Sequence, residues 1–144
     1  MARRMIGARR TFSAAFCLVV IGSACSALAA SDGNASVDRY YSKTYTDCMD
    51  AAGGSTYPMR DCIGAEHAAW DNALNQIYQV LMTSRSPAEK VELRDDERAW
   101  LKATARKCRH AGDDEAGGSL QNVEIDMCFM DETIRRAVYL RGLH

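Results

Sequence analysis

One stretch of the sequence decides the fold of this chain: Cys62-Ile-Gly-Ala-Glu-His-Ala-Ala-Trp-Asp-Asn-Ala-Leu-Asn-Gln-Ile-Tyr-Gln-Val-Leu81. Its apolar side chains recur at steps of three and four residues, and this period places them on one broad face of an α-helix. The acids, the amides and the histidine fall mostly on the opposite face. We therefore interpret the stretch as a scaffold helix rather than as an active site. The apolar face consists of Cys62, Ala65, Ala69, Trp70, Ala73, Leu74, Ile77, Tyr78 and Leu81.

The same helical period recurs in three further segments, and glycine or proline residues mark the turns between them. The first of these turns is Gly53–Pro58. No segment alternates with the period of two that is expected of a strand. The predicted fold is all-α, a small four-helix bundle made of two helical hairpins. The predicted helices cover residues 36–52, 59–83, 87–110 and 120–140.

The first 30 residues have the composition of a secretory signal peptide. Four arginines precede the short apolar run Phe16–Ile21, and the small residues of Ser26–Ala30 contain an Ala-x-Ala cleavage pattern. The apolar run is too short to span a bilayer comfortably. We predict that residues 1–30 are a signal peptide, cleaved after Ala29 or Ala30. Residues 31–144 are then a single helical domain of a periplasmic or secreted protein.

Two variants of this interpretation stay open. The stretch Arg9-Arg-Thr-Phe12 resembles a twin-arginine export motif. The stretch Ile21-Gly-Ser-Ala-Cys25 resembles a lipoprotein cleavage box, although Gly22 stands where a leucine is usual. Lipidation would attach Cys25 to a membrane. We favour a protein without this anchor, so we expect membrane contact only if Cys25 is lipidated.

Removal of the signal peptide changes the charge of the protein. All four basic residues of the first 30 positions are arginines and no acid lies there, so residues 31–144 carry 14 Lys and Arg against 19 Asp and Glu, a net charge of −5. Binding to phosphate needs a basic surface, which argues against nucleic acid as a partner. An acidic surface is compatible with electrostatic steering toward a basic protein.

Four cysteines remain after the signal peptide, which is an even number in an oxidising compartment, and two disulfides are expected. Cys48 lies near the end of the first predicted helix and Cys62 near the start of the second, so an antiparallel hairpin brings them side by side. Cys108 and Cys128 stand in the same relation across the second hairpin. These two pairings are favoured over the other two connectivities, which would tie the hairpins to each other.

Catalytic and metal-binding patterns are not found in the sequence. Glu66 and His67 are adjacent on a helix and point about 100 degrees apart, and His110 falls in the last turn of a helix, where a cation is favourable. A remote alternative is an enzyme that uses His67 or His110. The four cysteines lack the spacing of zinc or haem sites. We predict a protein that is not an enzyme and has no cofactor.

The polar residues of the long helix have a structural interpretation. Glu66, Asp71 and Asn75 lie at helical spacing, and they could reach Arg98 and Arg136 on neighbouring helices. Such a polar network would set the register of the bundle. A direct role in binding a partner is the alternative.

One ordered set of residues runs through nearly all of residues 31–144. It comprises Cys62, Glu66, Asp71–Tyr78, Glu97–Lys102, Cys108, Gly117–Ser119, Cys128, Thr133, Arg136 and Leu140. This set resembles the N-terminal-type domain of the LprI-like lysozyme inhibitors. The resemblance implies a helical, disulfide-bonded fold and a protein that acts by binding another protein, possible partners being lysozymes of the c-type.

Lysozymes of the common kind are basic and use carboxylates in a cleft, so the resemblance implies an acidic surface that occludes this cleft. We expect this surface in the loop residues Asp113, Asp114 and Glu115, with Asp95 and Asp96 as a second candidate patch. The same charges also fit a purely solubilising role. The alternative function is a non-catalytic binding protein of the cell envelope or of a secretion system, without activity on lysozyme.

Overall fold

The computed structural model describes residues 36–143, and the predicted signal peptide and Cys25 lie outside this range. The described part is helical and contains no strand, which confirms the all-α prediction. In this part, none of the helices combines the length and the apolar character that a membrane crossing needs. The elements are η1 (Asp38–Tyr40), α1 (Lys43–Ala52), α2 (Thr56–Ser84), α3 (Pro87–Arg109), η2 (Asp113–Glu115) and α4 (Gln121–Arg141).

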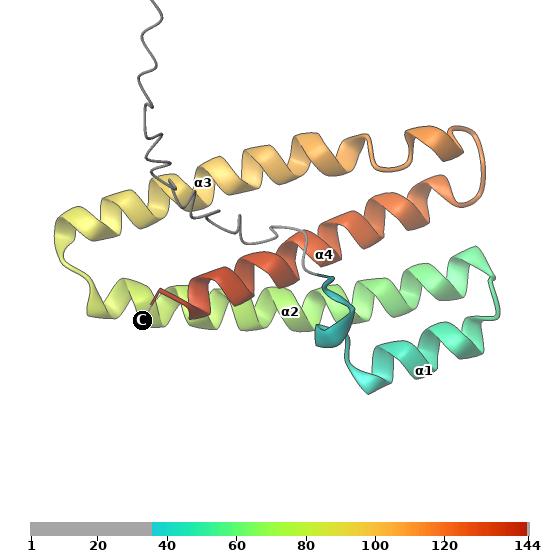
Figure 1. The fold of residues 1–144 in the computed structure, drawn as a ribbon, viewed down its shortest axis with the longest axis horizontal. Helices are drawn as coiled ribbons and strands as arrows, with labels where there is room; N and C mark the ends of the chain where they lie inside the picture. Colours follow the sequence, from blue (N-terminus) through green and yellow to red (C-terminus); the bar gives the residue numbers. More distant parts are fainter. Residues whose placement is uncertain (1–35, 144) are drawn as a thin grey trace, which may run out of the picture. The chain divides into compact units, whose positions relative to one another are not determined.

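The four α-helices form two hairpins, α1–α2 and α3–α4, as predicted (Figure 1). α2 and α4 pack along each other and form the centre of the bundle. α3 packs on α4, and α1 packs on α2. Helix α4 therefore lies between α2 and α3, and the short α1 covers only one end of α2 (Figure 1).

The hydrophobic core follows the seam between α2 and α4. Burial of a large apolar side chain contributes about 1.5–3 kcal/mol, so a seam of this kind supplies most of the stability of a small bundle. Trp70 contacts both of the core clusters into which the seam divides. The most deeply buried large side chains of the seam are Ile63, Leu81, Val123, Met130, Ile134 and Leu140.

The first predicted helix, 36–52, is interrupted in the structure. Tyr41 is extended, with φ −64° and ψ 136°, and separates η1 from α1. Ser42 then caps α1, because its Oγ accepts a hydrogen bond from the backbone N–H of Tyr45 at 3.0 Å. The second helix begins at Thr56, before the predicted residue 59, and includes Pro58 in its first turn, where proline is tolerated.

Two carboxylates hold the segment before α1 against the bundle. Glu66 of α2 is 6 % exposed and accepts hydrogen bonds from the N–H of Ser42 at 2.9 Å, from its Oγ at 2.6 Å, and from Trp70 Nε1 at 3.1 Å. Asp131 of α4 accepts a hydrogen bond from the hydroxyl of Tyr41 at 2.8 Å. Burial raises the pKa of Asp131, although the bond from Tyr41 opposes this shift. The Glu66–Ser42 and Asp131–Tyr41 hydrogen bonds join residues that are 24 and 90 positions apart in the sequence.

The predicted polar network between Glu66 and the arginines does not form. Arg136 is 7 % exposed and instead donates to Glu97 Oε2 at 2.7 Å and to Asp96 Oδ2 at 2.6 Å, both on α3. Burial disfavours its charge, but these two carboxylates outweigh that effect and raise the pKa of Arg136. Glu66 is occupied by Ser42 and Trp70, so it and Arg136 have separate partners.

The other three residues of that predicted network make local contacts. Asn75 Nδ2 donates to Asp71 Oδ2 at 3.0 Å within α2. Arg98 Nη1 lies 3.3 Å from Asp95 Oδ1 within α3, and both side chains are exposed. Exposed pairs of this kind contribute little to stability.

Both predicted disulfides are present. Cys48–Cys62 joins α1 to α2 with a Cα–Cα distance of 5.8 Å, and Cys108–Cys128 joins α3 to α4 with a distance of 5.4 Å. Each bridge therefore closes one hairpin near its turn, and neither bridge ties the two hairpins to each other.

We expect each disulfide to stabilise the domain substantially. Replacement of Cys108 and Cys128 together by Ala should lower the free energy of unfolding by about 3 kcal/mol, because the unfolded chain regains the entropy of an open loop. The double replacement of Cys48 and Cys62 should cost a similar amount. Urea unfolding monitored by circular dichroism measures both values, and a loss below about 1 kcal/mol would contradict the expectation.

The buried ion pairs of Arg136 should contribute far more than the exposed pair of Arg98. Arg136→Met leaves the carboxylate of Glu97, whose side chain is 14 % exposed, without a cation, and we expect a loss of about 3 kcal/mol in the free energy of unfolding. The matched variant Arg98→Met should cost less than about 1 kcal/mol. Equal losses in the two variants, measured by urea unfolding, would show that burial of the pair is not decisive.

Candidate functional site

The turns of the two hairpins lie at the same end of the bundle (Figure 1). Arg60 Nε near the start of α2 lies 2.6 Å from Asp126 Oδ2 near the start of α4, which ties the two turns together. A notch of 180 Å³ separates them and is lined by residues of both turns. We call this region, residues 53–57 and 110–120, the stapled end, because each of its turns is closed by a disulfide. The notch is lined by Thr56, Tyr57, Arg60, Gly118, Ser119 and Asn122.

Glycines shape both turns of the stapled end. Gly53 and Gly54 have φ of 56° and 81°, in the left-handed region that side chains disfavour. Gly112 lies so close to α4 that an added Cβ would stand 2.5 Å from the carbonyl oxygen of Gln121. Any larger residue at position 112 would therefore displace the loop from α4.

The predicted acidic residues form the short helix η2 within this end. Asp113, Asp114 and Glu115 are all exposed. Asp113 Oδ2 lies 2.9 Å from Nδ1 of His110. Within residues 36–143, neither Asp114 nor Glu115 takes part in an ion pair.

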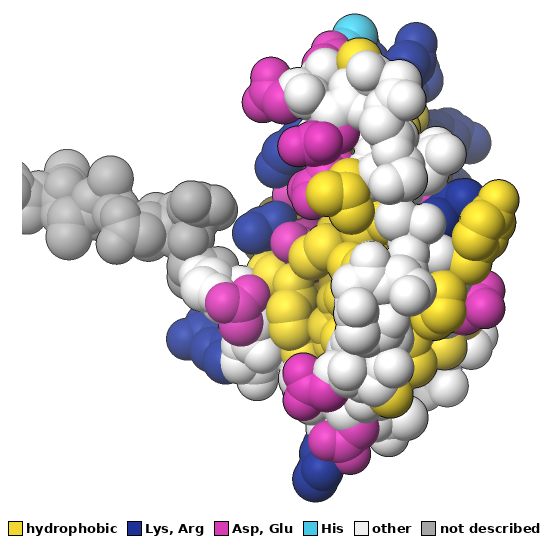
Figure 2. Space-filling view, turned by 90° about the vertical axis from the view of Figure 1, so that its right-hand side faces the viewer, with side chains coloured by type: hydrophobic (Ala, Val, Ile, Leu, Met, Phe, Trp, Pro, Cys, Tyr) yellow, Lys and Arg dark blue, Asp and Glu magenta, His cyan; other side chains and the backbone are white. Residues whose placement is uncertain are grey.

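Basic residues stand beside the acidic ones. The last turn of α3 carries Arg106, Lys107 and Arg109. Figure 2 shows the molecule from the side of this end, with acidic and basic side chains interspersed around exposed hydrophobic ones. The stapled end is therefore a mixed surface, on which Asp114 and Glu115 of η2 are the acids without an ion pair among the described residues.

The second predicted acidic patch lies in α3 and is engaged within the fold. Asp96 binds the buried guanidinium of Arg136, and Asp95 lies beside Arg98. Both carboxylates thus face a cation of their own chain.

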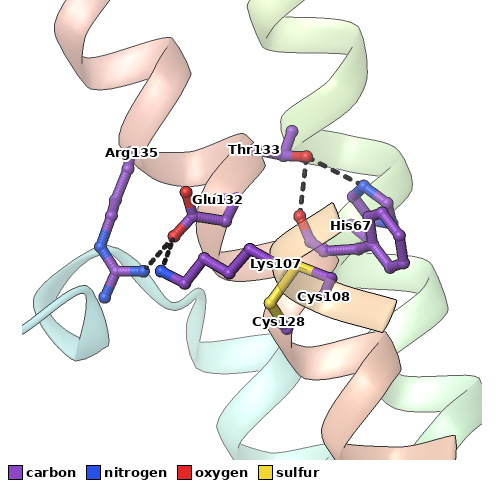
Figure 3. Close-up of a disulfide and its surroundings, with 8 residues drawn as sticks. His67, Lys107, Cys108, Cys128, Glu132, Thr133 and Arg135 are labelled. Carbon is purple, nitrogen blue, oxygen red and sulfur yellow. Dashed lines mark hydrogen bonds and ion pairs between the residues drawn. A yellow bond between two sulfur atoms is a disulfide. The ribbon is translucent and has the colours of Figure 1, made fainter. Parts of the chain in front are cut away.

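The two histidines that an enzyme would use lie apart and have different partners. Nε2 of His67 lies 3.0 Å from Oγ1 of Thr133 on α4, next to the Cys108–Cys128 disulfide (Figure 3). The Thr133 hydroxyl also lies 2.9 Å from the carbonyl oxygen of Phe129, to which it can donate a hydrogen bond. Nearby, Glu132 accepts from Lys107 and Arg135 (Figure 3).

Two grooves flank α2. A groove of 560 Å³ between α2 and α3 is lined in part by His67, Asp71, Asn75 and Arg98. It exists because α3 packs on α4 and leaves α2 uncovered there. Three residues predicted to join a structural network thus line an open groove instead.

The second groove, of 610 Å³, lies beside α1 and is lined by Ala65, Ala69 and Ala73 among other residues. We placed these alanines on the apolar face of α2, but Ala65 and Ala69 are exposed. The buried face is rotated from the predicted one and includes Ile63 and Glu66. The helical pattern predicted the wrong face because alanine occurs both in the core and on the surface of proteins.

Tyr57 is a residue that the sequence did not single out. We assigned it to a connecting turn, yet it belongs to the first turn of α2 and is 81 % exposed. An aromatic residue near a glycine pair and next to a proline was the available signal.

Within residues 36–143, no group of three or more His, Cys, Asp or Glu side chains is placed to hold a metal ion.

The comparison with family models gives one match. The model described as Lysozyme inhibitor LprI matches residues 48–140, which include all four disulfide cysteines and the whole stapled end. No curated protein and no solved structure matches the chain. The match extends over more than half of the chain, and the helical, disulfide-bonded fold agrees with the resemblance seen in the sequence. The chain belongs to the LprI lysozyme-inhibitor family.

Proposed function

We propose that this chain is a periplasmic or secreted inhibitor that binds a basic lysozyme and covers its cleft with the acidic residues of η2. The observation that carries this proposal is the position of Asp114 and Glu115. They are exposed, lack an ion pair among the described residues, and lie in a loop that connects two helices joined by a disulfide. Membership of an inhibitor family supports a protein partner of this kind.

The rigidity of the stapled end favours an inhibitor that occludes. An ordered loop loses little conformational entropy when it enters a cleft, and preorganisation of this kind increases affinity. The Cys108–Cys128 bridge and the close contact of Gly112 with Gln121 hold the loop to the bundle. Occlusion requires no chemistry from the inhibitor, because access to the catalytic carboxylates of the lysozyme is blocked.

The distribution of charge favours η2 over the patch on α3. A basic partner is attracted by carboxylates that have no cation of their own. Asp96 is engaged by Arg136 and Asp95 by Arg98, whereas Asp114 and Glu115 remain available. The net charge of −5 over residues 31–144 adds attraction at long range.

The two disulfides and the family are typical of a protein outside the cytoplasm. The predicted signal peptide would direct the export of the protein from the cytoplasm. We propose that the active form consists of residues 31–144 with both bridges oxidised.

The charges of η2 should control binding to the lysozyme. Simultaneous replacement of Asp113, Asp114 and Glu115 by Ala should weaken binding to a purified basic c-type lysozyme by roughly tenfold at low salt, mostly through slower association. The difference should shrink at physiological salt, because ions screen exposed charges. Surface plasmon resonance at two salt concentrations, together with a cell-wall lysis assay, measures both effects.

A matched variant distinguishes the effect of the loop on binding from the effect of the net charge. Simultaneous replacement of Asp71, Glu92 and Asp95 by Ala removes the same charge from exposed positions of α2 and α3. We expect this control to bind almost as well as the wild type. A larger loss in the control than in the η2 variant would move the contact to α3. Absence of any inhibition by the wild type would favour the alternative, a binding protein of the cell envelope.

A further inference from the structure

Tyr57 stands out among the exposed hydrophobic side chains. It is 81 % exposed, whereas the next most exposed large hydrophobic residue of the described part, Val80, is 56 % exposed. No hydrogen bond to its hydroxyl is found within residues 36–143. The ring of Tyr57 therefore contributes little to the stability of the fold.

The backbone that carries Tyr57 is firmly positioned. The residue lies in the first turn of α2, directly after the turn of Gly53 and Gly54. The next residue is Pro58, whose ring restricts φ. Five positions further along, Cys62 is bonded to Cys48 of α1. A partner would thus meet a ring whose base is already in place, and only the two side-chain torsions of the tyrosine remain to be ordered.

Tyr57 belongs to the same surface as the acidic loop. It lines the notch between the two turns together with Gly118 and Ser119, which follow η2 by a few residues. The Arg60–Asp126 ion pair holds the two sides of this notch in register. Figure 2 shows exposed hydrophobic side chains at this end, with acidic and basic side chains scattered among them. The notch thus places one large aromatic side chain among polar neighbours, a combination that protein interfaces also use.

We propose that Tyr57 is the aromatic anchor of the partner-binding surface, and that it enters the cleft of a basic protein while η2 contributes the acidic rim. This inference rests on the proposed function and names the residue that would carry most of its binding energy. Tyrosine is enriched at such energetic centres because it buries a large rigid surface and still offers a hydroxyl to a polar partner. The acidic residues of η2 near Tyr57 attract positive charge, so this surface favours a cationic partner protein.

Three variants test the anchor against the purified basic c-type lysozyme by isothermal titration calorimetry. Tyr57→Ala should weaken binding by on the order of 30-fold, the loss typical of an interface anchor. Tyr57→Phe keeps the ring and should stay within about threefold of the wild type. Val80→Ala removes another exposed apolar side chain, from the far half of α2, and should bind like the wild type.

The thermal midpoint of each variant shows whether the fold is retained, and we expect no change because Tyr57 is exposed. Equal binding by Tyr57→Ala and the wild type would overturn the anchor but leave the proposed function standing. A loss in Tyr57→Phe as large as in Tyr57→Ala would also contradict an apolar anchor. If the wild type itself fails to bind the lysozyme, both the anchor and the proposed function are wrong.

A second measurement tests direct contact. The photoreactive residue p-benzoylphenylalanine is placed at Tyr57 in one protein and at Val80 in another, and each is irradiated with the lysozyme. A covalent adduct from position 57 and none from position 80 supports the proposal. An adduct from position 80 alone would place the partner elsewhere on α2 and overturn it.

Discussion

The packing of α2 against α4 is the contact on which the rest of the structure depends. The most deeply buried large side chains come from these two helices, and α1 and α3 pack mainly on α2 and on α4, respectively. A helix pair of this length buries enough apolar surface to define a core, but it leaves both outer flanks of α2 partly open. The two grooves beside α2 follow directly from that arrangement.

Buried carboxylates and one arginine attach the outer elements to this seam. Glu66 binds the segment before α1, and Arg136 binds α3 through Glu97 and Asp96. Each bond pairs a side chain of the seam with an outer element, so it specifies where that element docks. Buried polar groups need their partners, and a shift of either element would leave a charge without one.

The stapled end obtains its rigidity from covalent bonds rather than from the core. A small domain has little apolar surface to spare for its turns, and the two disulfides close both turns at the same end of the bundle. Polar and aromatic residues can then remain exposed there without unfolding the loops.

The sequence by itself determined the order of the four helices, both disulfide pairings and the location of the acidic loop, but not the break at Tyr41 in the first predicted helix. These features are local, because helical period, turn residues and the closing of a hairpin involve neighbours along the chain. Tertiary structure decided the partners of Glu66 and Arg136, the exposure of Ala65 and the projection of Tyr57. Each of these depends on which helices touch, and the position of α4 between α2 and α3 is a long-range consequence of packing that no local pattern contains.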